Sequence, residues 1–307
     1  MEFGGLIDAS LIDSVVRSLI PILLAALGGL ICERAGIFNI ALEGMMLVGA
    51  FFAVAASYWS GSALVGVLTA AVASAVFSLI LAFGTVSRGA DPIVLGVAMN
   101  ILAVGLTSFL LVAFFHTQGF FQDPGIVGLG TIPIPLLSQI PWIGDAFFDL
   151  TILGYLAFAL VPITSVVLFR TPLGLRLRGV GERPLAAETL GVSPTKYQYG
   201  AVLVSGVLTG LAGAQLALGN VVQFAEGMTA GRGWIAVVAV MLARAMPLWT
   251  LLAALLFGFV EALGYRLQGQ GLAAQVTEAA PYVVTLVALL LSARIFRKDK
   301  TIAGGGA

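Results

Sequence analysis

The sequence is poor in the residues that carry redox, metal and nucleotide chemistry. A single cysteine, Cys32, lies within an apolar run, so an intramolecular disulfide is excluded. A single histidine, His116, argues against a histidine-based metal or catalytic cluster, and the chain contains no Walker A sequence for nucleotide hydrolysis. Charged residues are 10% of the chain and the formal net charge is zero, so nothing favours nucleic acid as a partner. We therefore expect no catalytic residue, metal site or cofactor in this chain.

Apolar residues, by contrast, are abundant. They make up 60% of the 307 residues, and the mean hydropathy is +1.07, which is typical of a polytopic membrane protein. A helix needs roughly 20 apolar residues to cross about 30 Å of hydrocarbon. The pattern predicts an all-α fold with spans near 14–31, 40–57, 63–84, 92–115, 150–169, 199–219 and 281–296.

The number of spans depends on the region from Trp234 to Tyr265. It is too long for one upright helix and short for two, and it is interrupted around Pro247. The basic carboxyl-terminal tail should lie on the same side as the basic centre of the chain, which requires an even number of crossings between them. Two short spans, 234–243 and 248–265, satisfy this rule. We therefore expect about nine spans, within a range of eight to ten, in one transmembrane domain covering 1–307.

The basic residues also predict the orientation. Nine spans place twelve basic residues in the cytoplasm and three outside. The amino terminus is then outside, the carboxyl terminus is inside, and the connection 116–148, which has no Lys or Arg, is an external folded loop. An acidic tail precedes the first apolar segment, so we expect no cleavable signal peptide and a retained first span.

Polar residues within the spans are candidates for a solute pathway. Asn39, Glu43, Asn100 and Gln215 fall at depths where lipid offers no hydrogen-bonding partner. They either line a pathway for a polar solute or form hydrogen bonds between helices, and the sequence leaves both readings open. Arg34 could pair with Glu33 or Glu43.

Three further polar residues lie near or beyond the predicted outer face. We expect Glu226 and Arg232 to act in an outer gate or in docking a partner, and Glu261 to be structural.

The basic segment from Arg170 to Lys196 separates two apolar stretches. It holds five of the fifteen basic residues, so it should face the cytoplasm. Pro184 suits a first helical turn, and Gly191 suits the position after a last one. The pattern predicts a short helix that lies across the membrane surface.

Two motifs together resemble a known family. They are ERAGIFNIALEGMMLVGAF, from Glu33 to Phe51, and GVGERPLAAETLGVSPTKYQYGAVLVSGVLTGLAGA, from Gly179 to Ala214. The chain resembles permease subunits of bacterial ABC importers of the branched-chain amino acid and simple sugar group, and is most similar to nucleoside uptake permeases. The Asn-Ile-Ala-Leu-Glu-Gly core at 39–44 favours nucleosides, because sugar permeases usually carry an aspartate-containing version there.

The resemblance implies a type II ABC-importer-like permease in the bacterial plasma (inner) membrane, forming half of the pathway. It implies three protein partners: an ABC ATPase subunit that binds ATP and Mg, a second homologous permease in a heterodimer, and an extracytoplasmic substrate-binding protein. Membrane lipid surrounds the assembly. The residues that match the family's cytoplasmic coupling helix are Glu182, Arg183, Pro184, Ala187, Glu188, Thr189, Gly191 and Val192.

Other functions remain open at this point. A simple sugar or a branched-chain amino acid is the main alternative substrate. A secondary carrier driven by ions would need intramembrane carboxylates, for which Glu43 and Glu261 are isolated candidates. A membrane-embedded enzyme is the weakest alternative, because the sequence offers no recognisable nucleophile or metal cluster.

Overall fold

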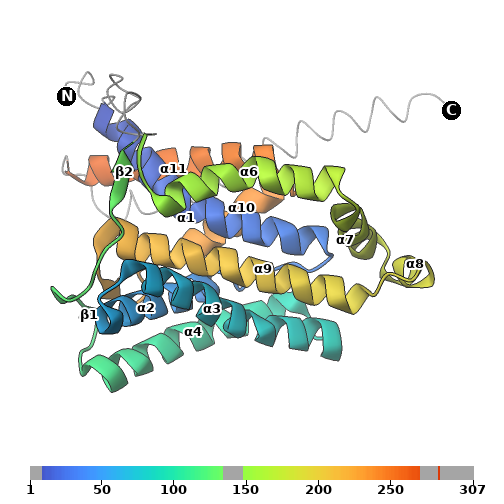
Figure 1. Ribbon diagram of the computed structural model, residues 1–307, viewed down its shortest axis with the longest axis horizontal. Helices are drawn as coiled ribbons and strands as arrows, with labels where there is room; N and C mark the ends of the chain where they lie inside the picture. Colours follow the sequence, from blue (N-terminus) through green and yellow to red (C-terminus); the bar gives the residue numbers. More distant parts are fainter. Residues whose placement is uncertain (1–8, 134–147, 270–282, 284–307) are drawn as a thin grey trace.

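The computed structural model describes residues 9–133, 148–269 and 283, and within them it is a bundle of helices (Figure 1). Most long helices run along one common direction. At one end of the bundle lie α7 (Pro172–Glu182) and α8 (Pro184–Thr189), and we call this the α8 end. At the other end lie the short strands β1 (Phe120–Phe121) and β2 (Thr131–Pro133), and we call this the strand end.

Seven described helices are long and apolar enough to cross a membrane. They are α1 (Ala9–Arg34), α2 (Leu42–Ser60), α3 (Ala63–Ala82) with the π-helix η2 (Phe83–Ser87), α4 (Pro92–Phe115), α6 (Ile152–Arg170), α9 (Pro194–Ala214) with the π-helix η3 (Gln215–Val221), and α11 (Pro247–Gly269). These confirm the predicted all-α membrane fold. The predicted span at 281–296 lies outside the described residues.

The predicted short span 234–243 is present as a helix, but this helix is too short to cross a membrane by itself. The structure has α10 (Arg232–Leu242) there, and its 11 residues extend only about 16 Å, half of what hydrocarbon requires. The chain nevertheless passes from one end to the other. Strand β4 (Phe224–Ala225) pairs with β1 at the strand end, whereas the Ala245 carbonyl after α10 binds Arg34 where α1 ends. A non-helical stretch therefore completes the crossing, and the expected even number is preserved.

The first two helices are joined by a similar break. Helix α1 ends at Arg34, and the segment 37–40, which has no regular secondary structure, leads to the start of α2. Much of this segment is buried, including Ile37 and Asn39. Its buried backbone polar groups need partners within the protein, because lipid has none to offer.

Helices α1, α2 and α9 form the core, while α3, α4, α6 and α11 each keep an apolar outer face. Glycine brings the core helices into backbone contact. A Cβ added to Gly49 would lie 2.7 Å from the Gly210 Cα, and one added to Gly213 would strike the carbonyl of Met46. These small residues therefore allow α9 to approach α2 closely.

The strand end is closed by two antiparallel pairs. Strand β1 pairs with β4, and β2 pairs with β3 (Asp149–Thr151). The first pair connects the loop after α4 to the segment after η3, and the second connects it to the segment before α6. The described part of the expected external loop, 116–133, is folded as predicted.

Candidate functional site

Asn39 and Asn100 hold the break between α1 and α2 in place. Asn39 accepts a hydrogen bond from the Ala41 N–H at 2.9 Å and donates to the Ser205 hydroxyl of α9 at 3.0 Å. The Asn100 amide, on α4, accepts from the Gly44 N–H at 2.8 Å and donates to the Ile40 carbonyl at 3.0 Å. Both side chains are buried. They supply the backbone partners that this segment would otherwise lack.

Gln215 plays a similar role where α9 passes into η3. Its side-chain carbonyl accepts a 2.6 Å hydrogen bond from the Thr151 hydroxyl, and its amide donates to the Asn220 side chain at 3.1 Å. The side chain is 2% exposed. Like Asn39 and Asn100, Gln215 forms the hydrogen bonds between segments that the sequence left open as an alternative, and its role in a pathway stays a prediction.

Glu43 joins two helices at their amino-terminal ends. It lies in the first turn of α2, and its carboxylate accepts hydrogen bonds from the Gly231 N–H at 2.9 Å and the Gly233 N–H at 2.7 Å, at the start of α10. An added Cβ at Gly233 would strike the backbone of Glu43, so the two helix starts touch. A helix amino terminus carries a partial positive charge. The Glu43 carboxylate lies at the amino termini of both α2 and α10, so its negative charge suits both helices.

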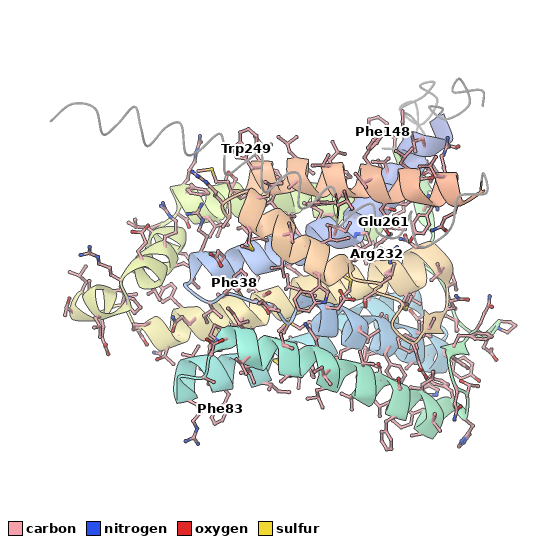
Figure 2. The ribbon with its side chains drawn as sticks, turned by 180° about the vertical axis from the view of Figure 1, so that it is seen from behind. Phe38, Phe83, Phe148, Arg232, Trp249 and Glu261 are labelled. Atoms are coloured by element: carbon pink, nitrogen blue, oxygen red, sulfur yellow. The ribbon has the colours of Figure 1, made fainter. Side chains whose placement is uncertain are left out.

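Arg232, the first residue of α10, is bound to α11. The Arg232 guanidinium forms an ion pair with Glu261 and donates to the Tyr265 hydroxyl at 2.9 Å, and that hydroxyl donates to Glu261 at 3.1 Å (Figure 2). The Arg232 and Glu261 side chains are 11% and 10% exposed. Glu261 thus holds α11 to α10, in keeping with the structural role expected of it. Arg232 is engaged in this contact, and its part in docking stays a prediction.

The other end of α10 is held by α1. Arg34 donates to the Ala245 carbonyl at 2.8 Å and to the Arg244 carbonyl at 3.1 Å, and its guanidinium lies over the Phe169 ring. Among the described residues Arg34 forms no close ion pair with Glu33 or Glu43, although the charge of Glu33 acts on its guanidinium. Carbonyls at a helix carboxyl terminus are partly negative and lack helical partners, so they attract the guanidinium. Both Arg244 and Ala245 have positive φ, which places an irregular turn before α11.

The basic segment forms two helices where one was expected. Helix α8 starts at Pro184 and is followed by Gly191 at φ +79°, which confirms the predicted helix and its stop. Helix α7 was missed, although its start is typical of a helix amino terminus. The Thr171 hydroxyl accepts from the Gly174 N–H, and proline follows at the first helical position.

Helix α8 lies beyond the membrane-length helices (Figure 1). Leu185 is 79% exposed and Leu190 is 84% exposed, while Ala187 is buried. Sequence reasoning selected the charged residues Glu182, Arg183 and Glu188 instead, together with Thr189 and Val192. A strongly exposed leucine pair outside the hydrocarbon is typical of a protein contact surface.

Helix α7 contacts the break between α1 and α2. A Cβ added to Gly181 would strike the Arg34 carbonyl and lie 2.9 Å from the Gly36 nitrogen, so these backbones touch. Movement of α7 must therefore displace the end of α1 or bend the segment that follows it.

At the strand end, Glu226 binds the loop after α4. Its carboxylate accepts from the Gly119 N–H at 3.1 Å, and its own N–H donates to the Gly119 carbonyl at 2.8 Å. The side chain remains exposed, and its docking role stays a prediction. Among the described residues no three His, Cys, Asp or Glu side chains group as metal ligands would.

Comparison with known proteins agrees with this arrangement. Residues 11–293 match the family described as "Branched-chain amino acid transport system / permease component". A solved structure described as an inward-facing conformation of a putative metal-chelate type ABC transporter has a TM-score of 0.50 at 17% identity. It covers 92% of this chain and 83% of that one, and it supports the fold.

Three curated relatives are similar over most of their length. The guanosine ABC transporter permease protein NupQ of Bacillus subtilis is 37% identical, covering 93% of this chain and 92% of the relative. The nucleoside ABC transporter permease protein NupC of Lactococcus lactis is 38% identical, covering 88% of each. The putative glucose ABC transporter permease protein TsgC13 of Haloferax volcanii is 39% identical, covering 86% of this chain and 80% of the relative.

Proposed function

Because the chain belongs to the permease family of branched-chain amino acid transport systems, we propose that it forms half of the membrane pathway of an ATP-driven nucleoside importer. The observation that carries the proposal is α8. It projects from the bundle with Leu185 and Leu190 exposed, as a helix that docks on another protein requires. In this proposal the docking partner is the ABC ATPase subunit, which binds ATP and Mg.

The orientation follows from the same helix. With α8 in the cytoplasm, the strand end lies outside, and so does the beginning of α1. The exposed Glu226 then faces the extracytoplasmic substrate-binding protein, which we propose docks at the strand end. A second homologous permease completes the pathway as a heterodimer.

The proposed mechanism transmits movement through backbone contacts. When ATP draws the ATPase subunits together, they displace α8 and, with it, α7. Helix α7 touches the chain at Gly36, and α10 is bound to α1 by Arg34 and to α2 by Glu43. Movement at α8 therefore reaches the two broken segments, which we propose open and close the pathway.

The substrate assignment rests on the nucleoside relatives and on the Asn-Ile-Ala-Leu-Glu-Gly core at 39–44. A sugar is the second candidate, because the glucose permease relative is equally similar at 39% identity. Within this short core, both Asn39 and Glu43 form hydrogen bonds that position the break.

The test is uptake of labelled adenosine, guanosine and glucose by vesicles containing the chain with its permease, ATPase and binding-protein partners. We expect nucleoside uptake that requires ATP and the ATPase subunit and that survives a proton ionophore. Glucose uptake without nucleoside uptake would show that the substrate is a sugar and not a nucleoside. Uptake by this chain alone that collapses with the ionophore would refute the importer and favour an ion-coupled carrier.

The docking surface has a separate test. Leu185→Ser combined with Leu190→Ser should abolish co-purification of the ATPase subunit, whereas Leu175→Ser, on α7 and 65% exposed, serves as the matched control. Retention of the ATPase by the double variant would refute the assignment of α8.

A further inference from the structure

A cavity opens beside the inner ends of α1 and α10. It is lined by Glu33, Arg34, Val240, Met241, Arg244 and Ala245, and we call it the vestibule. Its volume is about 420 Å³, within the roughly 300–1,000 Å³ of small-molecule sites.

The vestibule narrows toward the middle of the bundle. A second cavity of about 10 Å³ shares Glu33 and Val240 with it and is also lined by Phe38 and Leu42. That volume holds about one water-sized sphere, so a solute cannot pass. Phe38 lies on the α8 side of the Arg232–Glu261 pair (Figure 2). The structure is therefore open at the vestibule and closed at Phe38.

The charged groups of the vestibule differ in what they bind. Arg34 is occupied by the Ala245 and Arg244 carbonyls. The exposed Glu33 carboxylate makes no hydrogen bond or close ion pair with any residue that the structure describes, although the charge of the neighbouring Arg34 acts on it. Glu33 also lies in the last turn of α1, where the helix dipole disfavours a negative charge. Its position therefore does not stabilise α1, which points to a role in binding.

A carboxylate accepts hydrogen bonds and donates none. The solute that suits this carboxylate and this wall has a pair of hydroxyl donors for Glu33 and an apolar face for Val240 and Met241. A nucleoside has both properties. We infer that the vestibule is the exit-side nucleoside site, in which Glu33 accepts hydrogen bonds from the ribose hydroxyls and Phe38 closes the membrane-buried end. This inference rests on the proposed function.

The test is protection of an introduced cysteine in the assembled transporter. Cys32 is fully buried, so Met241→Cys places one accessible thiol in the vestibule wall, where the native side chain is 52% exposed. Ser87→Cys is the matched control, because Ser87 is exposed at the same end and lines neither cavity. The probes are adenosine and 2′,3′-dideoxyadenosine, and the readout is the rate of reaction with a water-soluble maleimide.

We expect adenosine at ten times its Kd to slow labelling at position 241 about tenfold and to leave position 87 unchanged. The dideoxy analogue should protect much less, and Glu33→Ala should remove the difference between the two probes. Should the alanine variant fail to assemble, Glu33→Gln, which keeps one acceptor oxygen, should reduce the difference between the two probes without removing it.

Three results would overturn the inference in different ways. Absence of protection in a transporter that imports adenosine refutes the site and leaves the proposed function intact. Equal protection by both probes, unchanged in Glu33→Ala, refutes the role of Glu33. A transporter that imports no nucleoside refutes the proposed function and, with it, the identity of the ligand.

Discussion

The contact between Glu43 and α10 gives the sharpest quantitative prediction. Its carboxylate accepts two backbone N–H groups, from Gly231 at 2.9 Å and from Gly233 at 2.7 Å. Glu43→Gln keeps the shape of the side chain but leaves one acceptor oxygen, so one N–H group faces an NH₂ group. Only the local contact changes, because Glu43 lies in a helix of ordinary geometry.

Two contributions determine how much the opening free energy of the first turn of α10 falls in Glu43→Gln. A buried donor without a partner costs about 1–3 kcal/mol. Removing the negative charge from a helix amino terminus costs about 0.3–1 kcal/mol, or up to about 2 kcal/mol when partly buried. Together these terms should lower the opening free energy of the first turn of α10 by about 1.3–5 kcal/mol, or roughly 10- to 4,000-fold in the opening equilibrium.

Hydrogen exchange followed by mass spectrometry on the peptide containing 231–236 measures this directly. Glu226→Gln is the matched control, because Glu226 also accepts one backbone N–H, from Gly119, but is exposed. We expect fast exchange at the start of α10 only in Glu43→Gln. Unchanged protection there would show that the carboxylate does not hold α10.

Three further predictions concern glycine and the buried ion pair. Gly191→Val should uncouple ATP hydrolysis from uptake, because a β-branched residue at φ +79° costs roughly 1–2 kcal/mol. Gly179→Val is the control: a Cβ there meets no atom within 4 Å, so coupling should stay intact. Gly213→Ala should prevent stable folding, because its Cβ strikes a backbone carbonyl of α2; a monodisperse, thermally unchanged variant would contradict this. Arg232→Gln should destabilise the protein by about 3–5 kcal/mol by leaving Glu261 unpaired, and Glu261→Gln in the same chain should recover part of the loss in a thermal unfolding assay.

The sequence predicts the long spans and the short helix α8 because their signals are local. Apolar length sets the spans, and Pro184 and Gly191 mark where α8 begins and stops. Local signals do not show whether the α10 segment is a short membrane-crossing span or a shorter helix. Its length depends on where the chain enters the bundle, and strand pairing far along the sequence, between β4 and β1, determines that entry.

For the polar residues, too, the sequence identifies the residues but not their partners. Composition identifies Asn39, Glu43, Asn100 and Gln215 as unusual at their depth, and the structure confirms that each has a partner. Those partners lie on other helices, and a single sequence carries no record of which helices are neighbours. The exposed leucines of α8 were within reach, because two leucines in an otherwise polar stretch outside the spans have no membrane to bury them.

The glycine contact between α2 and α9 limits how the protein can change shape. Where Gly49 faces Gly210, backbone lies against backbone, and no layer of side chains exists there that could exchange one rotamer for another. The two helices therefore behave as a single rigid body. Any rearrangement must take place around that body, at contacts made by adjustable side chains, and the long side chains of Arg34 and Arg232 at the two ends of α10 provide such contacts.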